Sequence, residues 1–172
     1  MKLKEKRIAC LVEEEFDDLE LWVTVMRLRE EGAKVILVGS GRLESFRGKY
    51  GIPAKPNLNA NQASPDDFDA LIVPGGWAPD KLRRYPSITN LVHSMYEQNK
   101  IIGSICHGGS VLISAGIVKG HNATGTVAIK DDLINAGAKW VDKPAFRDGN
   151  LVWGRVVEDI PDFCRELVKA LA

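Results

Sequence analysis

The chain has 172 residues and a formal net charge of zero, because 23 lysines and arginines balance 23 aspartates and glutamates. This length supports one domain with a sizeable core, expected over residues 1–172. The balanced charge gives no nucleic-acid footprint and no polybasic membrane patch. The first apolar run, residues 8–12, ends at three glutamates and predicts neither a signal peptide nor a membrane span. The three cysteines form no CxxC pair, which favours a reducing, cytoplasmic setting.

The first half of the chain alternates between strand and helix patterns. Residues 7–12 form an apolar run that predicts a strand. A helix that stops at Gly32 is predicted next from residues at helical spacing, which are Leu19, Trp22, Val23, Met26 and Glu30. The elements that follow are a strand at 34–38, a hairpin within 43–55 around the glycine-rich turn 47–51, a loop at 57–67 and a buried strand at 69–73.

The second half continues the alternation. In chain order it predicts a helix at 86–98, a strand at 101–105, helices at 108–115 and 130–136, a hairpin at 145–153 turning at 148–150, and an amphipathic helix at 160–171. Continuous apolar strands that alternate with helices predict a doubly wound α/β sandwich with a mostly parallel central sheet.

Cys106 is the most informative residue of the chain. The strand pattern at 101–105 ends at this thiol, and Ser104-x-Cys106-x-Gly108 has the spacing of a nucleophile elbow with sulfur in place of oxygen. The start of the following helix offers free N–H groups and a positive dipole end, which favour a thiolate. His107 is a candidate base or cationic partner. The alternative is a buried structural cysteine at a strand end.

Three unusual segments, residues 14–18, 74–76 and 106–108, follow predicted strands. Ligands of doubly wound sheets bind outside the carboxyl ends of the strands, so the fold is expected to bring these segments together. The candidate donors to a developing oxyanion are the backbone N–H groups of Gly75, Gly76 and His107. For the glycines, a plain tight turn is the alternative. No metal-ligand spacing and no GxGxxG fingerprint occurs, so we expect no metal and no cofactor.

Asp17 is the acid predicted to face Cys106. A protonated carboxyl group there would donate a hydrogen bond to a thiolate. The alternative role for Asp17 is an N-cap of the first helix. Glu13, Glu14 and Asp18 are expected to be solvated charges that stabilise the helix start.

Several runs resemble the ThiJ/PfpI family, in order and across nearly the whole chain. They are Glu15-Phe16-Asp17-Asp18-Leu19-Glu20, Gly48-Lys49-Tyr50-Gly51, residues 68–76, Ile105-Cys106-His107-Gly108 and residues 129–138. The likeness is closest to the small, single-domain PfpI-like branch of the family. It implies a flavodoxin-like fold, in agreement with the predicted sandwich.

The resemblance also implies roles for individual residues. Cys106 matches the family's nucleophile, and His107 matches the histidine that follows it. Asp17 matches an acid, usually glutamate, that hydrogen-bonds the sulfur, although Asp17 is one methylene shorter. Asp80 matches an acid that reaches the histidine of a neighbouring subunit, which implies a homo-oligomer, either a dimer or a hexamer. Gly109 replaces a proline that is common at this position.

Three functions follow from these residues and from the resemblance. Thiolate attack on a carbonyl, as in glyoxalase or deglycase handling of methylglyoxal or glycated proteins, needs only a low-pKa thiol and a nearby acid. Peptide hydrolysis by an oligomeric cysteine peptidase needs a well-placed histidine as well. The third function is that of a non-enzymatic redox-sensing stress protein or chaperone, in which Cys106 is oxidised to a sulfinic acid.

Overall fold

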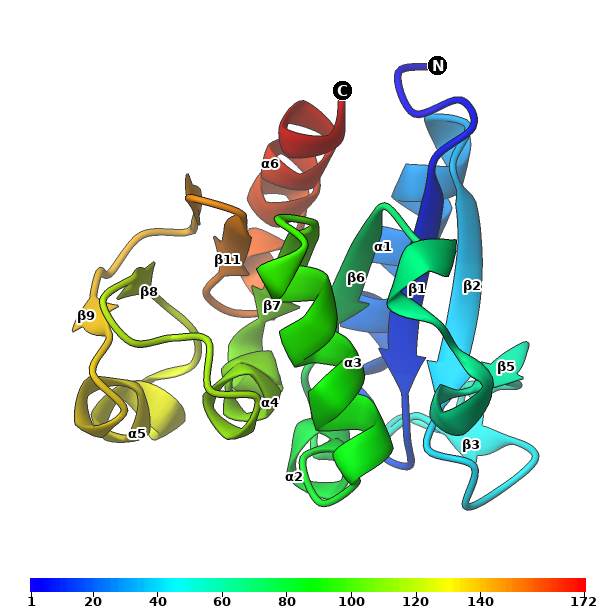
Figure 1. Ribbon diagram of the computed structural model, residues 1–172, viewed down its shortest axis with the longest axis horizontal. Helices are drawn as coiled ribbons and strands as arrows, with labels where there is room; N and C mark the ends of the chain where they lie inside the picture. The colour runs from blue at the N-terminus through cyan, green and yellow to red at the C-terminus, as the bar shows by residue number, and fades with distance from the viewer.

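The computed structural model describes residues 1–172 and has a central sheet with helices on both faces (Figure 1). The sheet has the strand order β10-β11-β7-β6-β1-β2-β5. Its strands are β1 Arg7–Val12, β2 Lys34–Gly39, β5 Leu58–Asn59, β6 Ala70–Val73, β7 Ile101–Ile105, β10 Ala145–Asp148 and β11 Leu151–Gly154. All neighbouring strands are parallel except the β10–β11 hairpin. The doubly wound, mostly parallel architecture is therefore confirmed.

The helices cover the two faces as a doubly wound fold requires. On one face, α1 (Asp18–Glu30) packs against α6 (Ile160–Leu171). On the other face lie α2 (Ala78–Leu82), α3 (Pro86–Glu97) and α4 (Gly109–Ser114), with α5 (Lys130–Asn135) beside α4. The strands β6 and β7 are buried along their whole length, which explains their unbroken apolar sequences.

Short strands account for most of the differences from the predicted elements, and the five-residue helix α2 was not predicted either. The predicted hairpin is present as β3 (Phe46–Arg47) and β4 (Pro53–Ala54). The predicted loop at 57–67 contains β5, which extends the sheet beyond β2. A separate pair of strands, β8 (Asn122–Ala123) and β9 (Lys139–Trp140), was not predicted. Strands of two residues are too short to carry a periodic signal.

The inner face of α1 carries Leu21, Val25 and Leu28, which are fully buried, and a second apolar stripe of the helix lies outside. Leu19, Val23 and Met26 are 51%, 42% and 63% exposed, whereas Glu20 is 1% exposed. These three residues follow at helical spacing and form an exposed apolar stripe on α1. The helix therefore directs an acid inward and leaves apolar side chains at the surface.

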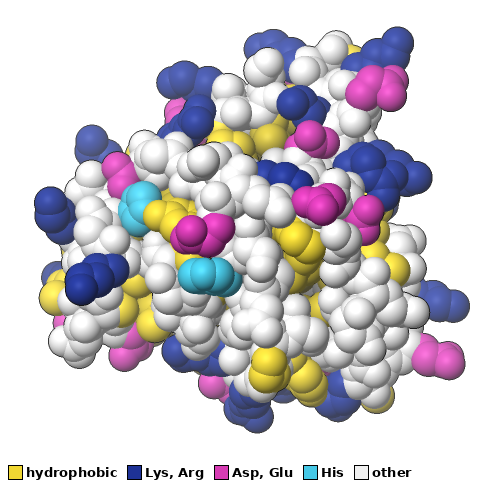
Figure 2. Space-filling model, viewed as in Figure 1, with side chains coloured by type: hydrophobic (Ala, Val, Ile, Leu, Met, Phe, Trp, Pro, Cys, Tyr) yellow, Lys and Arg dark blue, Asp and Glu magenta, His cyan; other side chains and the backbone are white.

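The surface charges are distributed as the composition suggests. On the face in Figure 2, Lys and Arg side chains are interspersed with Asp and Glu side chains. No helix is long and apolar enough to span a lipid bilayer.

Candidate active site

Cys106 stands where β7 ends and the chain turns into a helix. One 3₁₀ turn covers Cys106–Gly108, and α4 begins at Gly109. The φ angle of Cys106 is 59°, in the left-handed region that non-glycine residues rarely adopt. Such a conformation costs about 1–3 kcal/mol and persists only where the surrounding structure holds it. The structure therefore has the strained strand-to-helix turn of a nucleophile elbow.

Two glycines allow this turn to approach its neighbours. A Cβ atom at Gly108 would lie 2.4 Å from the Val73 carbonyl oxygen. A Cβ atom at Gly75 would lie 2.4 Å from Glu20 Oε2, 2.9 Å from Cys106 Cβ and 3.1 Å from the His107 nitrogen. The carboxyl ends of β6 and β7 and the start of α1 therefore meet at Gly75.

Glu20 is the acid that contacts the Cys106 thiol. Its carboxyl group lies beside Cys106, where burial and then its charge raise the pKa of the thiol, and its Oε2 atom accepts the Gly75 amide at 2.6 Å. Glu20 lies in the first turn of α1, on the side of the helix that faces the sheet. The bond from Gly75 holds the carboxyl group in this position.

Asp17 has a different role from the one the sequence predicted. Its Oδ1 atom accepts the amides of Leu19 and Glu20, both at 3.1 Å, and so caps α1. Its Oδ2 atom is 3.0 Å from Lys49 Nζ. The expected hydrogen bond from Asp17 to the sulfur is wrong, because capping turns this side chain toward the helix amides. The length of the Asp17 side chain therefore has no bearing on Cys106, because Asp17 points toward the helix amides instead.

The pKa values of Glu20 and Cys106 depend on each other. Burial raises the pKa of Glu20 to about 8, and the charge of Asp17 acts in the same direction, so Glu20 is protonated at neutral pH. Burial also raises the pKa of the Cys106 thiol to about 12, with the negative charge of Glu20 as the next cause. A protonated Glu20 carries no such charge and can donate to the sulfur, which favours the thiolate. The two groups therefore titrate as a pair: the first proton is lost near pH 8, and the remaining proton is shared between them, on Glu20 beside a thiolate or on the thiol beside a carboxylate.

His107 is half-buried beside the sulfur. Its Nδ1 atom is 3.5 Å from Cys106 Sγ. Its ring lies 5.2 Å from the Trp77 ring, centroid to centroid. Burial and then the positive charge of Lys49 lower the pKa of His107, so the imidazole is neutral at pH 7. Its catalytic role stays a prediction.

The three candidate oxyanion donors, the amides of Gly75, Gly76 and His107, differ in their partners. The Gly75 amide donates to Glu20, so it is unavailable and that prediction is wrong. The His107 amide lies beside the Cys106 sulfur and acts against burial to lower the pKa of the thiol. The bridge between Phe16 and Gly76 is made by flanking amides, Asp17 to the Gly75 carbonyl and Trp77 to the Glu15 carbonyl, which leaves the Gly76 amide unused. Gly76 therefore stays the predicted oxyanion donor.

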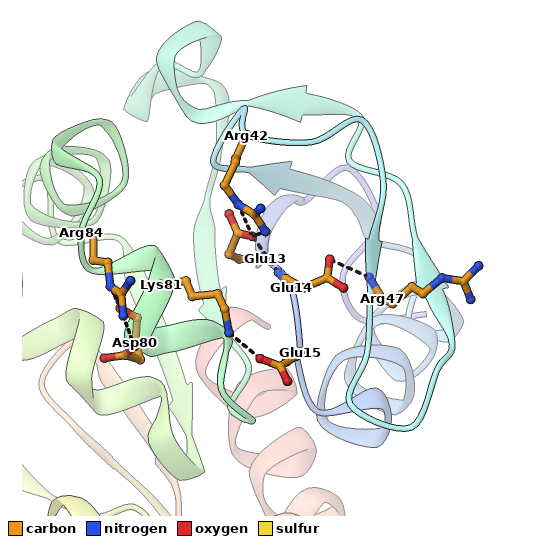
Figure 3. A network of polar contacts seen from close by, with 8 residues as sticks. All are labelled: Glu13, Glu14, Glu15, Arg42, Arg47, Asp80, Lys81 and Arg84. Atoms are coloured by element: carbon orange, nitrogen blue, oxygen red, sulfur yellow. Dashed lines mark hydrogen bonds and ion pairs between the residues drawn. The ribbon is translucent and has the colours of Figure 1, made fainter.

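The acidic run after β1 is tied to cations and amides (Figure 3). Glu13 is fully buried and pairs with Arg42 at 2.9 Å, and it also bonds the Ser40 hydroxyl. Glu14 accepts the Arg47 amide at 3.3 Å, and Glu15 pairs with Lys81 at 2.7 Å. The prediction that Glu13 is a solvated charge is therefore wrong. These contacts hold the loop between β1 and α1 in place.

Asp18 holds the turn that carries Lys49. It is buried, and its carboxylate accepts the amides of Tyr50 and Ile52, both at 2.9 Å. It is therefore not a solvated charge either. This anchor places the Lys49 ammonium beside Asp17 and near His107.

Asp80 lies on the surface, in α2. It pairs with Arg84 at 2.5 Å (Figure 3) and makes no hydrogen bond to His107 of its own chain. Its predicted role across a subunit boundary stays a prediction.

The fold and the site define an α/β protein with a cysteine at a nucleophile elbow, and comparison with known proteins specifies its family. The DJ-1/PfpI family model matches residues 6–170. "Deglycase PfpI" of Pyrococcus furiosus is 39% identical over 165 residues, covering 96% of this chain and 99% of that protein. "Putative cysteine protease YraA" of Bacillus subtilis is 35% identical over 166 residues, covering 96% and 98%. The chain belongs to the DJ-1/PfpI family.

A solved structure shows the same fold. A two-domain protein of Anabaena variabilis, with DJ-1/ThiJ/PfpI-like and ferritin-like domains, has a TM-score of 0.95 and 35% identity. The match covers 97% of this chain and 48% of that one. The flavodoxin-like fold implied by the sequence is confirmed.

The sequence prediction missed Glu20, although a signal for it exists. Glu20 is the third residue after the cap Asp17, a place where glutamate often serves the helix start itself. Its position distinguishes it, because Glu20 is an acid on the inner side of α1, opposite the exposed stripe.

Proposed function

We propose that this protein is a hydrolase-type enzyme whose Cys106 thiolate attacks the carbonyl group of small aldehydes such as methylglyoxal, or of glycated adducts. The Glu20–Cys106 pair carries this proposal, because a buried acid that is protonated at neutral pH can supply the proton the carbonyl oxygen needs. The 39% identity to a protein named a deglycase supports it.

The reaction of methylglyoxal balances with these residues alone. The Cys106 sulfur adds to the aldehyde carbon, and the aldehyde oxygen takes a proton from Glu20, which gives a hemithioacetal. The Glu20 carboxylate then removes the hydrogen from that carbon, which gives an enediol. Glu20 returns this proton to the neighbouring carbon, and the hydroxyl proton moves from the first oxygen to the second, which gives a lactate thioester. Water cleaves the thioester to lactate and the free thiol. The Gly76 amide is the proposed donor to the oxyanions of both additions.

Peptide hydrolysis is the second candidate, and it makes a further demand. The leaving amine has to be protonated by a positioned acid, usually an oriented imidazole. No acid of the same chain hydrogen-bonds the ring of His107. We therefore propose this activity only for an oligomer in which Asp80 of a neighbouring copy orients that ring.

A homo-oligomer, either a dimer or a hexamer, is part of the proposal. It is supported by the exposed apolar stripe of Leu19, Val23 and Met26, since contiguous exposed apolar surface marks association sites. A second copy of this chain can cover the stripe. Light scattering should give a multiple of the 18.9 kDa chain mass, and M26E should lower it.

The test measures loss of methylglyoxal and formation of lactate, in parallel with cleavage of a fluorogenic peptide. C106S should abolish turnover, whereas C164S, which changes a buried cysteine away from the site, should retain it. D80A should abolish peptide cleavage but spare methylglyoxal turnover. Cysteine-dependent peptide cleavage alone would favour the peptidase. Turnover of neither substrate would contradict the enzyme proposal and favour the redox-sensing alternative.

A further inference from the structure

Three residues form a second hydrogen-bonded chain, separate from the Cys106 site. Tyr96 is in the last turn of α3, His121 lies just before β8, and Asp148 is the last residue of β10. Tyr96 Oη is 2.8 Å from His121 Nε2, and His121 Nδ1 is 2.8 Å from Asp148 Oδ2. A hydroxyl, an imidazole and a carboxylate are therefore connected in the order of a hydrolase triad.

Asp148 fixes the orientation and the tautomer of His121. Its carboxylate also accepts the Asn122 amide at 3.1 Å and the Asn122 side-chain nitrogen at 3.4 Å. Burial acts to raise the pKa of Asp148, but the hydrogen bonds from His121 and Asn122 outweigh it and lower the pKa. The ionised carboxylate accepts a hydrogen bond from His121 Nδ1–H, which leaves Nε2 to accept the Tyr96 hydroxyl.

This cluster lies near the opposite end of β7 from Cys106. Tyr96 and the β10–β11 turn are near the start of β7, since Asn150 bonds the Tyr96 and Lys100 carbonyls, whereas Cys106 follows the end of β7. The length of β7, at about 3.3 Å per residue, separates the two sites. Nothing in the Cys106 mechanism uses this cluster.

The cluster is accessible from solvent. The side chains of His121 and Asp148 are 18% and 29% exposed. Tyr96 itself is half-buried, so the proposal requires a small reagent that reaches its hydroxyl past these two side chains.

We propose that Tyr96 is a second nucleophile of this protein, which His121 activates to accept acyl groups from activated esters and thioesters. The phenol oxygen attacks the acyl carbon, the oxygen–carbon bond to Tyr96 forms, and the bond to the leaving aryloxide or thiolate breaks. The phenol proton moves to His121 Nε2, and Asp148 stabilises the resulting imidazolium. Tyrosine is among the side chains that form such covalent intermediates when a base lies in hydrogen-bond reach.

The experiment acetylates the C106S protein with p-nitrophenyl acetate, so that the Cys106 thiolate cannot report. Peptide mass spectrometry follows each of the three tyrosines over time. Tyr50 is the internal control, because it is 74% exposed and bonds no histidine. Tyr96 should be acetylated about 100-fold faster than Tyr50, the lower range of general-base assistance.

Variants of the cluster separate activation from simple exposure. Y96F removes one hydroxyl group and should abolish the fast release of p-nitrophenolate, while methylglyoxal turnover in the Cys106-containing protein stays unchanged. H121Q should reduce acetylation of Tyr96 to the Tyr50 rate, and D148N should lower it part of the way. Equal rates at Tyr96 and Tyr50, which can be measured without any change to the cluster, would overturn the proposal. A rate at Tyr96 that is unaffected in a folded H121Q protein would overturn it as well.

Discussion

Glu20 Oε2 accepts the Gly75 amide at 2.6 Å, and the same carboxyl group lies beside Cys106. One side chain of α1 thus connects the ends of β6 and β7. Because burial keeps Glu20 protonated at neutral pH, this arrangement places a protonated acid beside Cys106.

Removing the proton of Glu20 should slow catalysis. E20Q keeps an oxygen for the Gly75 amide but cannot transfer a proton, so kcat/KM for methylglyoxal should fall about 10²- to 10⁴-fold. The matched control is D17N, which changes the neighbouring acid and should retain most activity. Steady-state kinetics of both variants checks this. Equal losses of kcat/KM in the two variants would contradict the assignment of Glu20 as the proton donor.

The free energy of unfolding should depend on pH through Glu20. The folded protein raises the pKa of Glu20 from 4.5 to about 8, so between these values the unfolded state binds fewer protons. The contribution of Glu20 to stability is therefore complete below pH 4.5 and is lost as pH rises toward 8, by at most about 1.4 kcal/mol per pH unit. Urea unfolding at pH 5 and pH 8 should show the wild type losing more stability than E20Q. Equal losses of stability in the wild type and in E20Q would show that Glu20 does not cause the pH dependence.

Adding a methyl group at Gly75 should reduce activity and stability more than adding one at Gly109. In G75A the new Cβ meets the Glu20 carboxylate at 2.4 Å, so activity should be lost and stability should fall by about 1–3 kcal/mol. In G109A the nearest atom is the flexible end of Ile129, at 2.9 Å, so much of the activity should remain. Methylglyoxal turnover and thermal unfolding compare the two. An active G75A protein would show that the close approach is not required.

Lys49 should control the protonation of His107. After burial, the charge of Lys49 is the next cause that lowers the pKa of His107. K49M should therefore raise the pKa of His107, as followed by NMR titration of its imidazole signals. K81M removes a lysine that pairs with Glu15 and should leave that pKa unchanged. An unchanged titration in K49M would show that its ammonium does not act on the ring.

The sequence by itself determined the sheet and the position of the nucleophile. Unbroken apolar runs such as 101–105 have to be buried on both sides, which requires a parallel sheet covered by helices. The elbow at Cys106 is local in sequence, because the strand end, the thiol and the small residues after it are adjacent. Both features could therefore be predicted without knowledge of distant contacts.

Only the tertiary structure decided which acid serves Cys106. Asp17 immediately precedes α1, and Glu20 lies in its first turn. From the sequence, either acid could cap the helix or face Cys106. Their roles depend on how α1 is rotated against the sheet, and that rotation directs Glu20 toward Gly75 while Leu19, Val23 and Met26 remain exposed. The apolar pattern of α1 does not fix this rotation, because Leu21, Val25 and Leu28 form a second apolar stripe at the same spacing. The Tyr96–His121–Asp148 chain likewise joins three segments that only the fold brings together.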